Sequence, residues 1–127
     1  MTDSILITQI TTDINGISIF SELEFAMQTR GGLFLTDQIG AKNFRIRKSA
    51  VGYSTDFHIT GDATFIIIQK GSLKIELQNG DSKIFNAGDS FITNDNLSDN
   101  NLFDSKIHGH KASVVGNEDL QAIHIKL

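Results

Sequence analysis

The chain has 127 residues, with 15 acidic and 11 basic side chains and no Cys, Trp or Pro. This length fits one domain, and the absence of Cys excludes disulfides, thiolate zinc sites and a cysteine nucleophile. A net charge of −4 would repel a phosphate backbone, so no nucleic-acid partner is expected.

The N-terminal ten residues carry an acid, and their apolar stretch is too short for a signal peptide or a membrane span. We therefore expect a cytoplasmic protein without membrane contact.

Short apolar runs separated by Gly, Asn and Asp predict an all-β domain, and a composition rich in Ile and Phe suits strands. Residues 21–28 are the one segment expected to form a helical turn. With no crossover helices, the pattern predicts a single barrel or sandwich over residues 1–127. The eleven predicted strands cover residues 5–10, 17–20, 33–35, 44–48, 57–59, 65–69, 73–77, 83–85, 90–93, 112–115 and 122–127.

The clearest part of the pattern is residues 65–93. Residues 65–68 are apolar on both faces, Gly71 follows as a turn, and residues 73–77 alternate apolar with charged side chains. Asn79-Gly80 indicates a two-residue hairpin of type I′, in which both central residues need a positive φ. We predict an antiparallel meander with three tight turns.

Residues 94–106 break this rhythm, because seven of the thirteen are Asn or Asp. A connection of this length is a tolerated surface insertion or a functional loop. In the second case Leu102 and Phe103 would form part of a lid over a cavity.

Residues 61–95, GDATFIIIQKGSLKIELQNGDSKIFNAGDSFITND, resemble the centre of a cupin. Residues 12–20 and 109–116 extend the resemblance to small single-domain bacterial cupins of the RmlC-like type, a group without an established common activity. The resemblance implies a double-stranded β-helix, which is a jelly-roll barrel with its site in the interior.

The metal motif of this family is degenerate in the chain. Gly52 and His58 keep the spacing of the first motif, but its second His is replaced by Thr60 and its Glu by Thr64. The His of the second motif is replaced by Phe91. One imidazole cannot replace the three protein ligands that catalytic metal sites typically use, so we expect no cofactor at the usual four positions.

Another set of histidines offers an alternative. His108 and His110 lie two residues apart, so on a strand both would point to one face. Together with His58 they could hold one divalent transition metal. In the other interpretation His108 is solvated and His110 alone packs inward. His124, between two Ile, is expected to be a satisfied or exposed side chain.

Arg45 and Arg47 also share a face, opposite to Phe44 and Ile46. Two guanidinium groups on one face can clamp a carboxylate or phosphate. If Phe44 and Ile46 fill the barrel, both arginines point to solvent, which is the commoner outcome for such a strand.

Two functions follow from these residues. The first is a binding module, in which His58, Thr60, Thr64 and His110 hold a small organic molecule without a metal. The alternative is a metal-dependent enzyme, such as an oxygenase, isomerase or lyase, that uses His58, His108 and His110.

A metal-free enzyme is a third hypothesis. Sugar-modifying cupins pair a His base with a carboxylate or a Tyr, and Tyr53 and Asp56 directly precede His58. A purely structural role would instead predict a collapsed barrel interior. The sequence does not identify a catalytic residue or a substrate.

A homodimer is predicted from the strand at residues 65–69. If Thr64 faces inward, Ile66 and Ile68 do so as well, which leaves Phe65 and Ile67 on the outside. Large exposed apolar patches are not normal on a monomer. The alternative is that residues 5–10 cover the patch within one chain.

Overall fold

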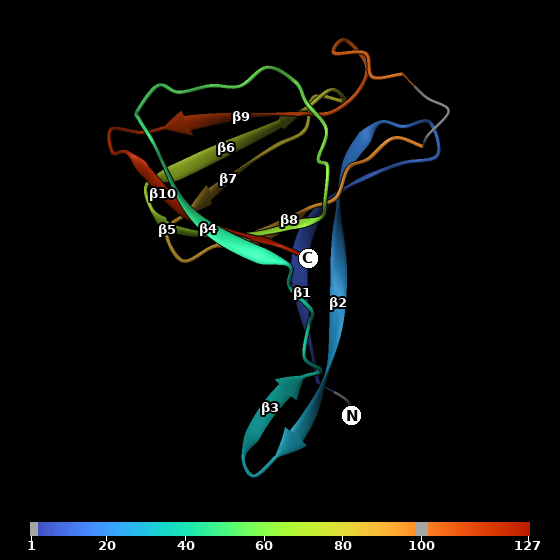
Figure 1. Ribbon diagram of the computed structural model, residues 1–127, viewed down its shortest axis with the longest axis vertical. Coiled ribbons are helices and arrows are strands. Elements are labelled where there is room, and N and C mark those ends of the chain that lie inside the picture. The colour runs from blue at the N-terminus through green and yellow to red at the C-terminus, as the bar shows by residue number, and fades with distance from the viewer. Residues whose placement is uncertain (1–2, 99–101) are drawn as a thin grey trace.

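The computed structural model describes residues 3–98 and 102–127. Its strands form two sheets that enclose one core (Figure 1). A seven-stranded sheet has the order β3-β2-β1-β8-β5-β10-β4, and a three-stranded sheet has the order β7-β6-β9. The strands are β1 (Ser4–Thr12), β2 (Ser18–Arg30), β3 (Leu33–Thr36), β4 (Asn43–Ser49), β5 (Thr64–Lys70), β6 (Ser72–Leu77), β7 (Ser82–Asn86), β8 (Ser90–Thr93), β9 (His110–Val115) and β10 (Leu120–Lys126).

The chain passes back and forth between the two sheets, which produces a jelly roll. Residues 53–58 add a fourth, irregular row to the small sheet, through bridges from Ser54 to Ser113 and from His58 to His110. The two halves are then β4-β10-β5-β8 and 53–58-β9-β6-β7. This is the connectivity of an eight-stranded jelly roll, so the predicted all-β fold of the cupin type is confirmed.

The predicted meander over residues 65–93 is wrong, although its strands are present. β5 pairs with β8 and β10, whereas β6 pairs with β7 and β9. The turn at Gly71, with φ of 79°, carries the chain from one sheet to the other. A Cβ on Gly71 would lie 2.7 Å from the carbonyl oxygen of Asp119, so this crossing requires glycine.

The hairpin between β6 and β7 is confirmed, but its turn is longer than predicted. Gly80 has φ of 95°, whereas no non-glycine residue of the described chain has a positive φ, which excludes a type I′ turn. The Asn79 side chain instead accepts a hydrogen bond from the Asp81 N–H at 2.8 Å. An Asn whose side chain bonds to the backbone two residues further on can stabilise a turn without adopting a positive φ itself.

The predicted helical turn at residues 21–28 is also wrong, because β2 continues through it. Leu23, Phe25 and Met27 alternate with Glu22 and Glu24, which is the period of a strand and not of a helix. β2 pairs with β1 from Ser18 to Ala26.

Residues 27–36, which we call the arm, extend away from the barrel (Figure 1). Beyond Ala26 the end of β2 pairs with β3. β1 lies in the plane of the large sheet, next to β8, and does not cover the outside of β5. The alternative in which residues 5–10 cover Phe65 and Ile67 is therefore wrong.

The core lies between the sheets and leaves one end of the barrel hollow. Phe85 and Phe91 stack in it with ring centroids 4.1 Å apart. Ile66 and Ile68 point into the core, while Phe65 and Ile67 face outward, as their alternation predicts. The described residues contain no helix that could cross a membrane.

Candidate functional site

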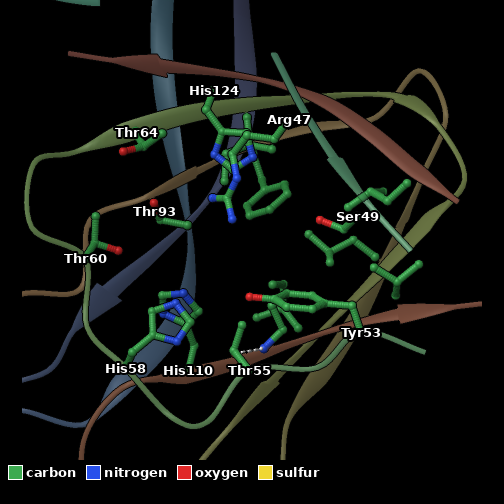
Figure 2. A pocket seen from close by; sticks show the side chains of 17 residues that line it. Arg47, Ser49, Tyr53, Thr55, His58, Thr60, Thr64, Thr93, His110 and His124 are labelled. Atoms are coloured by element: carbon green, nitrogen blue, oxygen red, sulfur yellow. Dashed lines mark hydrogen bonds between the residues drawn. The ribbon is translucent and has the colours of Figure 1, made fainter. Parts of the chain in front are cut away.

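An open cavity of about 200 Å³ lies inside the barrel and receives side chains from both sheets (Figure 2). Its volume corresponds to roughly seven water molecules at about 30 Å³ each. A purely structural role predicts a collapsed barrel interior, and the interior is instead open. The polar side chains that line it belong to Arg47, Ser49, Tyr53, Thr55, His58, Thr60, Thr64, Thr93, His110 and His124.

The four residues predicted to bind a ligand, His58, Thr60, Thr64 and His110, all line this cavity. The two histidines face each other across a backbone bridge, in which each N–H donates to the other residue's carbonyl at 2.9 Å. Their ring centroids are 4.4 Å apart. The bridge requires Gly109, because a Cβ there would collide with the carbonyl oxygen of His58.

A buried carboxylate stands behind this pair of histidines. Asp95 has no exposed surface, and its Oδ2 lies 2.7 Å from Nδ1 of His110. The same oxygen accepts a hydrogen bond of 2.6 Å from Ser18, while Oδ1 accepts one of 2.8 Å from Thr60. These bonds compensate the burial of a charged group and hold the His110 ring in one orientation.

In both imidazoles Nδ1 is the bonded ring nitrogen, although His58 is exposed and His110 is buried. Nδ1 of His58 donates to the carbonyl of Asp56 at 2.9 Å, because a carbonyl only accepts, and Nδ1 of His110 is taken by Asp95. No buried side-chain nitrogen or oxygen in the described part of the chain lacks a partner. Nε2 of His110, which has no protein partner in residues 3–98 and 102–127, is thus open to the cavity.

The opposite wall of the cavity carries Arg47 and His124 (Figure 2). β4 and β10 pair so that Arg47 lies opposite Ala122 and Arg45 opposite His124. Ala122 is 1% exposed, whereas Phe44 and Ile46 are 69% and 60% exposed. Both arginines therefore lie on the inner side of the strand. Both are exposed, as predicted for a solvated side, but Arg47 also lines the cavity.

His124, which was predicted to be a satisfied or exposed side chain, also lines the cavity. Burial, together with the smaller effect of the positive charges of Arg47 and Arg45, lowers its pKa from 6.5 to about 4. At neutral pH the ring is uncharged, so Arg47 supplies the fixed positive charge of this wall.

The residues do not fit the four-ligand metal site of cupins. The Thr60 hydroxyl donates to Asp95, the Thr64 hydroxyl donates to the carbonyl of Asp62 at 2.9 Å, and Phe91 is a fully buried core side chain. No three His, Asp or Glu side chains within residues 3–98 and 102–127 gather closely enough to hold an ion. Two imidazoles are fewer than the three ligands of typical catalytic sites.

His108 does not join His58 and His110. Its Nδ1 accepts a hydrogen bond of 2.9 Å from the N–H of Asp104, and its ring lies against Phe103 with centroids 6.2 Å apart. Gly109, with φ of 90°, breaks the alternation that would place both histidines on one face. The geometry gives no support to a site of His58, His108 and His110.

The lid hypothesis for residues 94–106 has no support in the described part of that loop. Leu102 is 90% exposed and Phe103 is 44% exposed, and neither lines the cavity. Residues 99–101 of this segment lie outside the described residues. The loop's contribution is instead Asp95, at its beginning.

Sequence reasoning missed Asp95 because it is one of seven Asn and Asp residues in that segment, and no local signal sets it apart. Tyr53, considered as a partner of His58, does line the cavity, whereas Asp56 contributes its backbone carbonyl. The only sequence signal for Arg47 was its alternation with Phe44 and Ile46. That alternation shows that Arg47 lies on the other side of the strand, but not which side faces the cavity.

No protein-family model matches the sequence, and no curated protein sequence is significantly similar to it. Two solved structures resemble the chain in shape. Protein NMB1881 from Neisseria meningitidis is 13% identical, with 80% of this chain and 79% of that one covered and a TM-score of 0.49. A candidate ethanolamine utilization protein Q from Salmonella typhimurium is 10% identical, with 99% and 96% covered and a TM-score of 0.41. At these identities nothing about activity follows.

Proposed function

We propose that the protein binds a small organic anion, most simply a carboxylate, in the barrel cavity, and that protein groups alone hold it. The observation that carries this proposal is Arg47, whose guanidinium reaches the cavity without an ion-pair partner in the described residues. An arginine fork matches a carboxylate in two parallel hydrogen bonds.

The other lining groups support an anion with additional polar atoms. Hydroxyls of Tyr53, Thr60 and Thr64 line the same space. The Thr60 and Thr64 protons are already donated to Asp95 and to the carbonyl of Asp62, so these two hydroxyls can accept hydrogen bonds from a ligand. The one carboxylate nearby, Asp95, is fully buried and already accepts three hydrogen bonds. It does not compete with a ligand for Arg47.

The size of the cavity restricts the ligand to a small metabolite. Its volume of about 200 Å³ is below the roughly 300 Å³ at which pockets for drug-sized molecules begin. Apolar side chains such as Ile66, Leu73 and Val114 line the remainder. A short carbon chain carrying one or two carboxylates fits this combination of volume and lining.

The proposal is tested by titrating the protein with short mono- and dicarboxylates and their neutral amides, by calorimetry or NMR. Carboxylates should bind and amides should not. Arg47→Gln should weaken binding about 10- to 100-fold, since a charged hydrogen bond contributes roughly 1.5–3 kcal/mol. Lys48→Gln, the next residue and on the other face, is the matched control. Equal binding by wild type and Arg47→Gln, or no binding to wild type, contradicts the proposal.

A second candidate function, metal-free proton transfer, is favoured by the pairing of Asp95 with His110. A carboxylate that holds Nδ1–H leaves Nε2 as a base directed at a bound molecule, and His58 offers a second such nitrogen. Its test is exchange of deuterium from solvent into a bound carboxylate. His110→Gln should abolish exchange and retain binding, and absence of exchange in wild type rules this candidate out.

A further inference from the structure

The outer face of the seven-stranded sheet is apolar across its whole width. Strand register places directly paired residues on the same face. Ile123 pairs with both Ile46 and Ile67, and Ile125 pairs with both Phe44 and Phe65. Further along the sheet, Phe65 pairs with Ile92, Ile5 with Phe25, and Ile7 with Leu23. We call this set the outer face. Phe44, Ile46 and Ile5 are exposed, Ile92 is buried, and the remaining members are half-buried. The set covers six strands, and five spacings of about 4.8 Å give it a width of roughly 24 Å.

The outer face has hardly any charge. In the outward alternation of the described strands, Lys48 at the end of β4 is the one charged side chain. Antiparallel sheets that face water normally carry polar side chains there. A hollow of about 280 Å³, lined by residues such as Ile5, Phe25, Phe65 and Ile125, makes part of this face concave. The segment after β3 borders the hollow through Ile39 and Ala41.

The arm continues the outer face beyond the barrel. Met27 pairs with Thr36 and Thr29 pairs with Phe34, so Met27 and Phe34 lie on the same side as Phe25. Phe34 is 53% exposed, and no residue from 28 to 48 is buried. A two-stranded hairpin without a packed face is marginal in water, so the arm needs a surface that its own barrel does not provide.

The opposite side of β2 is the solvated one. Glu22, Glu24 and Arg30 lie on this side and are exposed, together with the exposed leucines Leu6, Leu33 and Leu35. This side therefore mixes charged and apolar residues, whereas the outer face carries almost no charge, which favours the outer face as the contact surface.

We propose that a second copy of this chain covers the outer face, sheet against sheet about a two-fold axis, with each arm lying on the barrel part of the partner's outer face. One chain carries both halves of such a contact, a projecting apolar arm and a hollowed apolar sheet. A two-fold contact buries the same patch on both copies, so both are covered at once. The proposal is independent of the function proposed for the cavity.

The mass of the protein in solution tests this directly. Light scattering during gel filtration should give about 28 kDa, twice the 13.9 kDa of one chain, down to micromolar concentration. A wild-type mass of one chain at about 100 μM overturns the proposal. Larger, open-ended assemblies overturn it too, because they require a contact that does not close.

Variants on the two sides of the sheet then locate the interface. Phe34→Lys and Ile46→Lys replace exposed outer-face residues, and each should weaken the dimer by at least about tenfold, because a lysine is desolvated there. Leu35→Lys, on the same strand as Phe34 but on its other side, should leave the dimer intact. Circular dichroism checks that each variant is folded. If Phe34→Lys and Leu35→Lys weaken the dimer equally, the two copies meet through another surface, and the proposal is overturned.

Discussion

The two sides of the β4–β10 pair carry different chemistry within the same few residues. Arg47 and His124 line the cavity, while Phe44 and Ile46 point outward and are exposed. Alternation along a strand changes the side with each residue. One short stretch of sequence therefore contributes to the barrel cavity and to an apolar surface at the same time.

This contrast inverts the usual rule for a half-buried strand, in which the apolar side is inside. Inside, the cavity leaves room for a guanidinium because the barrel is not filled at that end. Outside, the exposed apolar residues continue over neighbouring strands. An interior that holds polar groups and an exterior that holds apolar ones are consistent with binding inside and association outside.

The largest loss of folding stability is expected from Asp95→Ala. This change acts on the barrel interior and leaves the outer face of the sheet untouched. The change leaves the side chains of His110, Ser18 and Thr60 without their acceptor. Removing one partner of a buried pair costs about 3–5 kcal/mol, measured by urea denaturation. The loss should be the same at every protein concentration, whereas Ile46→Lys should act through the dimer. Asp37→Ala, at an exposed carboxylate, is the control, and an equally small loss for both would contradict the structural role of Asp95.

A smaller but distinct loss is expected from Gly109→Ala. The new methyl group collides with the His58 backbone, and φ of 90° is strained for any residue with a Cβ. We expect a cost of about 1–3 kcal/mol and altered NMR shifts for His58 and His110. Gly61→Ala, where a Cβ meets nothing within 4 Å and φ is not positive, should be neutral. Two equally stable variants would show that the bridge between His58 and His110 is looser than described.

The smallest effect concerns the pH dependence of stability. His124 has a folded-state pKa of about 4 because of burial and the nearby Arg47 and Arg45, below the ordinary value of about 6.5. The unfolded chain then binds more protons between these values. The contribution of this group to stability is present above about pH 6.5 and is lost as pH falls towards 4.

NMR titration of His124 checks this, with Arg47→Gln expected to raise its pKa towards the ordinary value. A bound carboxylate should shift it in the same direction, because it offsets the charge of Arg47. No change of the His124 pKa in Arg47→Gln would mean that the two side chains do not share the cavity wall.

Most strands could be predicted from the sequence, because β-branched runs bounded by Gly, Asn and Asp are local signals. Two local predictions failed for local reasons. Residues 21–28 alternate with the period of a strand and form one, not the predicted helical turn. Asn79 stabilises its turn through its side chain, and not through the positive φ of a type I′ turn. The pairing of strands failed for a different reason, since alternation shows which residues share a face and not which strand lies next to which.

The site shows the same division. Sequence could predict that one cavity is lined by His58, Thr60, Thr64 and His110, because the resemblance to cupins indicates which positions face the barrel interior. Asp95 was not, because it reaches His110 from a segment whose other Asn and Asp residues resemble it in every local respect.

The sequence by itself determined an all-β chain, its turn positions at glycines and the alternation of its strands, because these follow from the preferences of single residues and their neighbours. The tertiary structure alone decided which face of β4 is inside, which carboxylate stands behind His110, and that no residue of the arm is buried among the described residues. Those properties depend on residues far apart in the sequence, and they exist only once the two sheets have closed around the cavity.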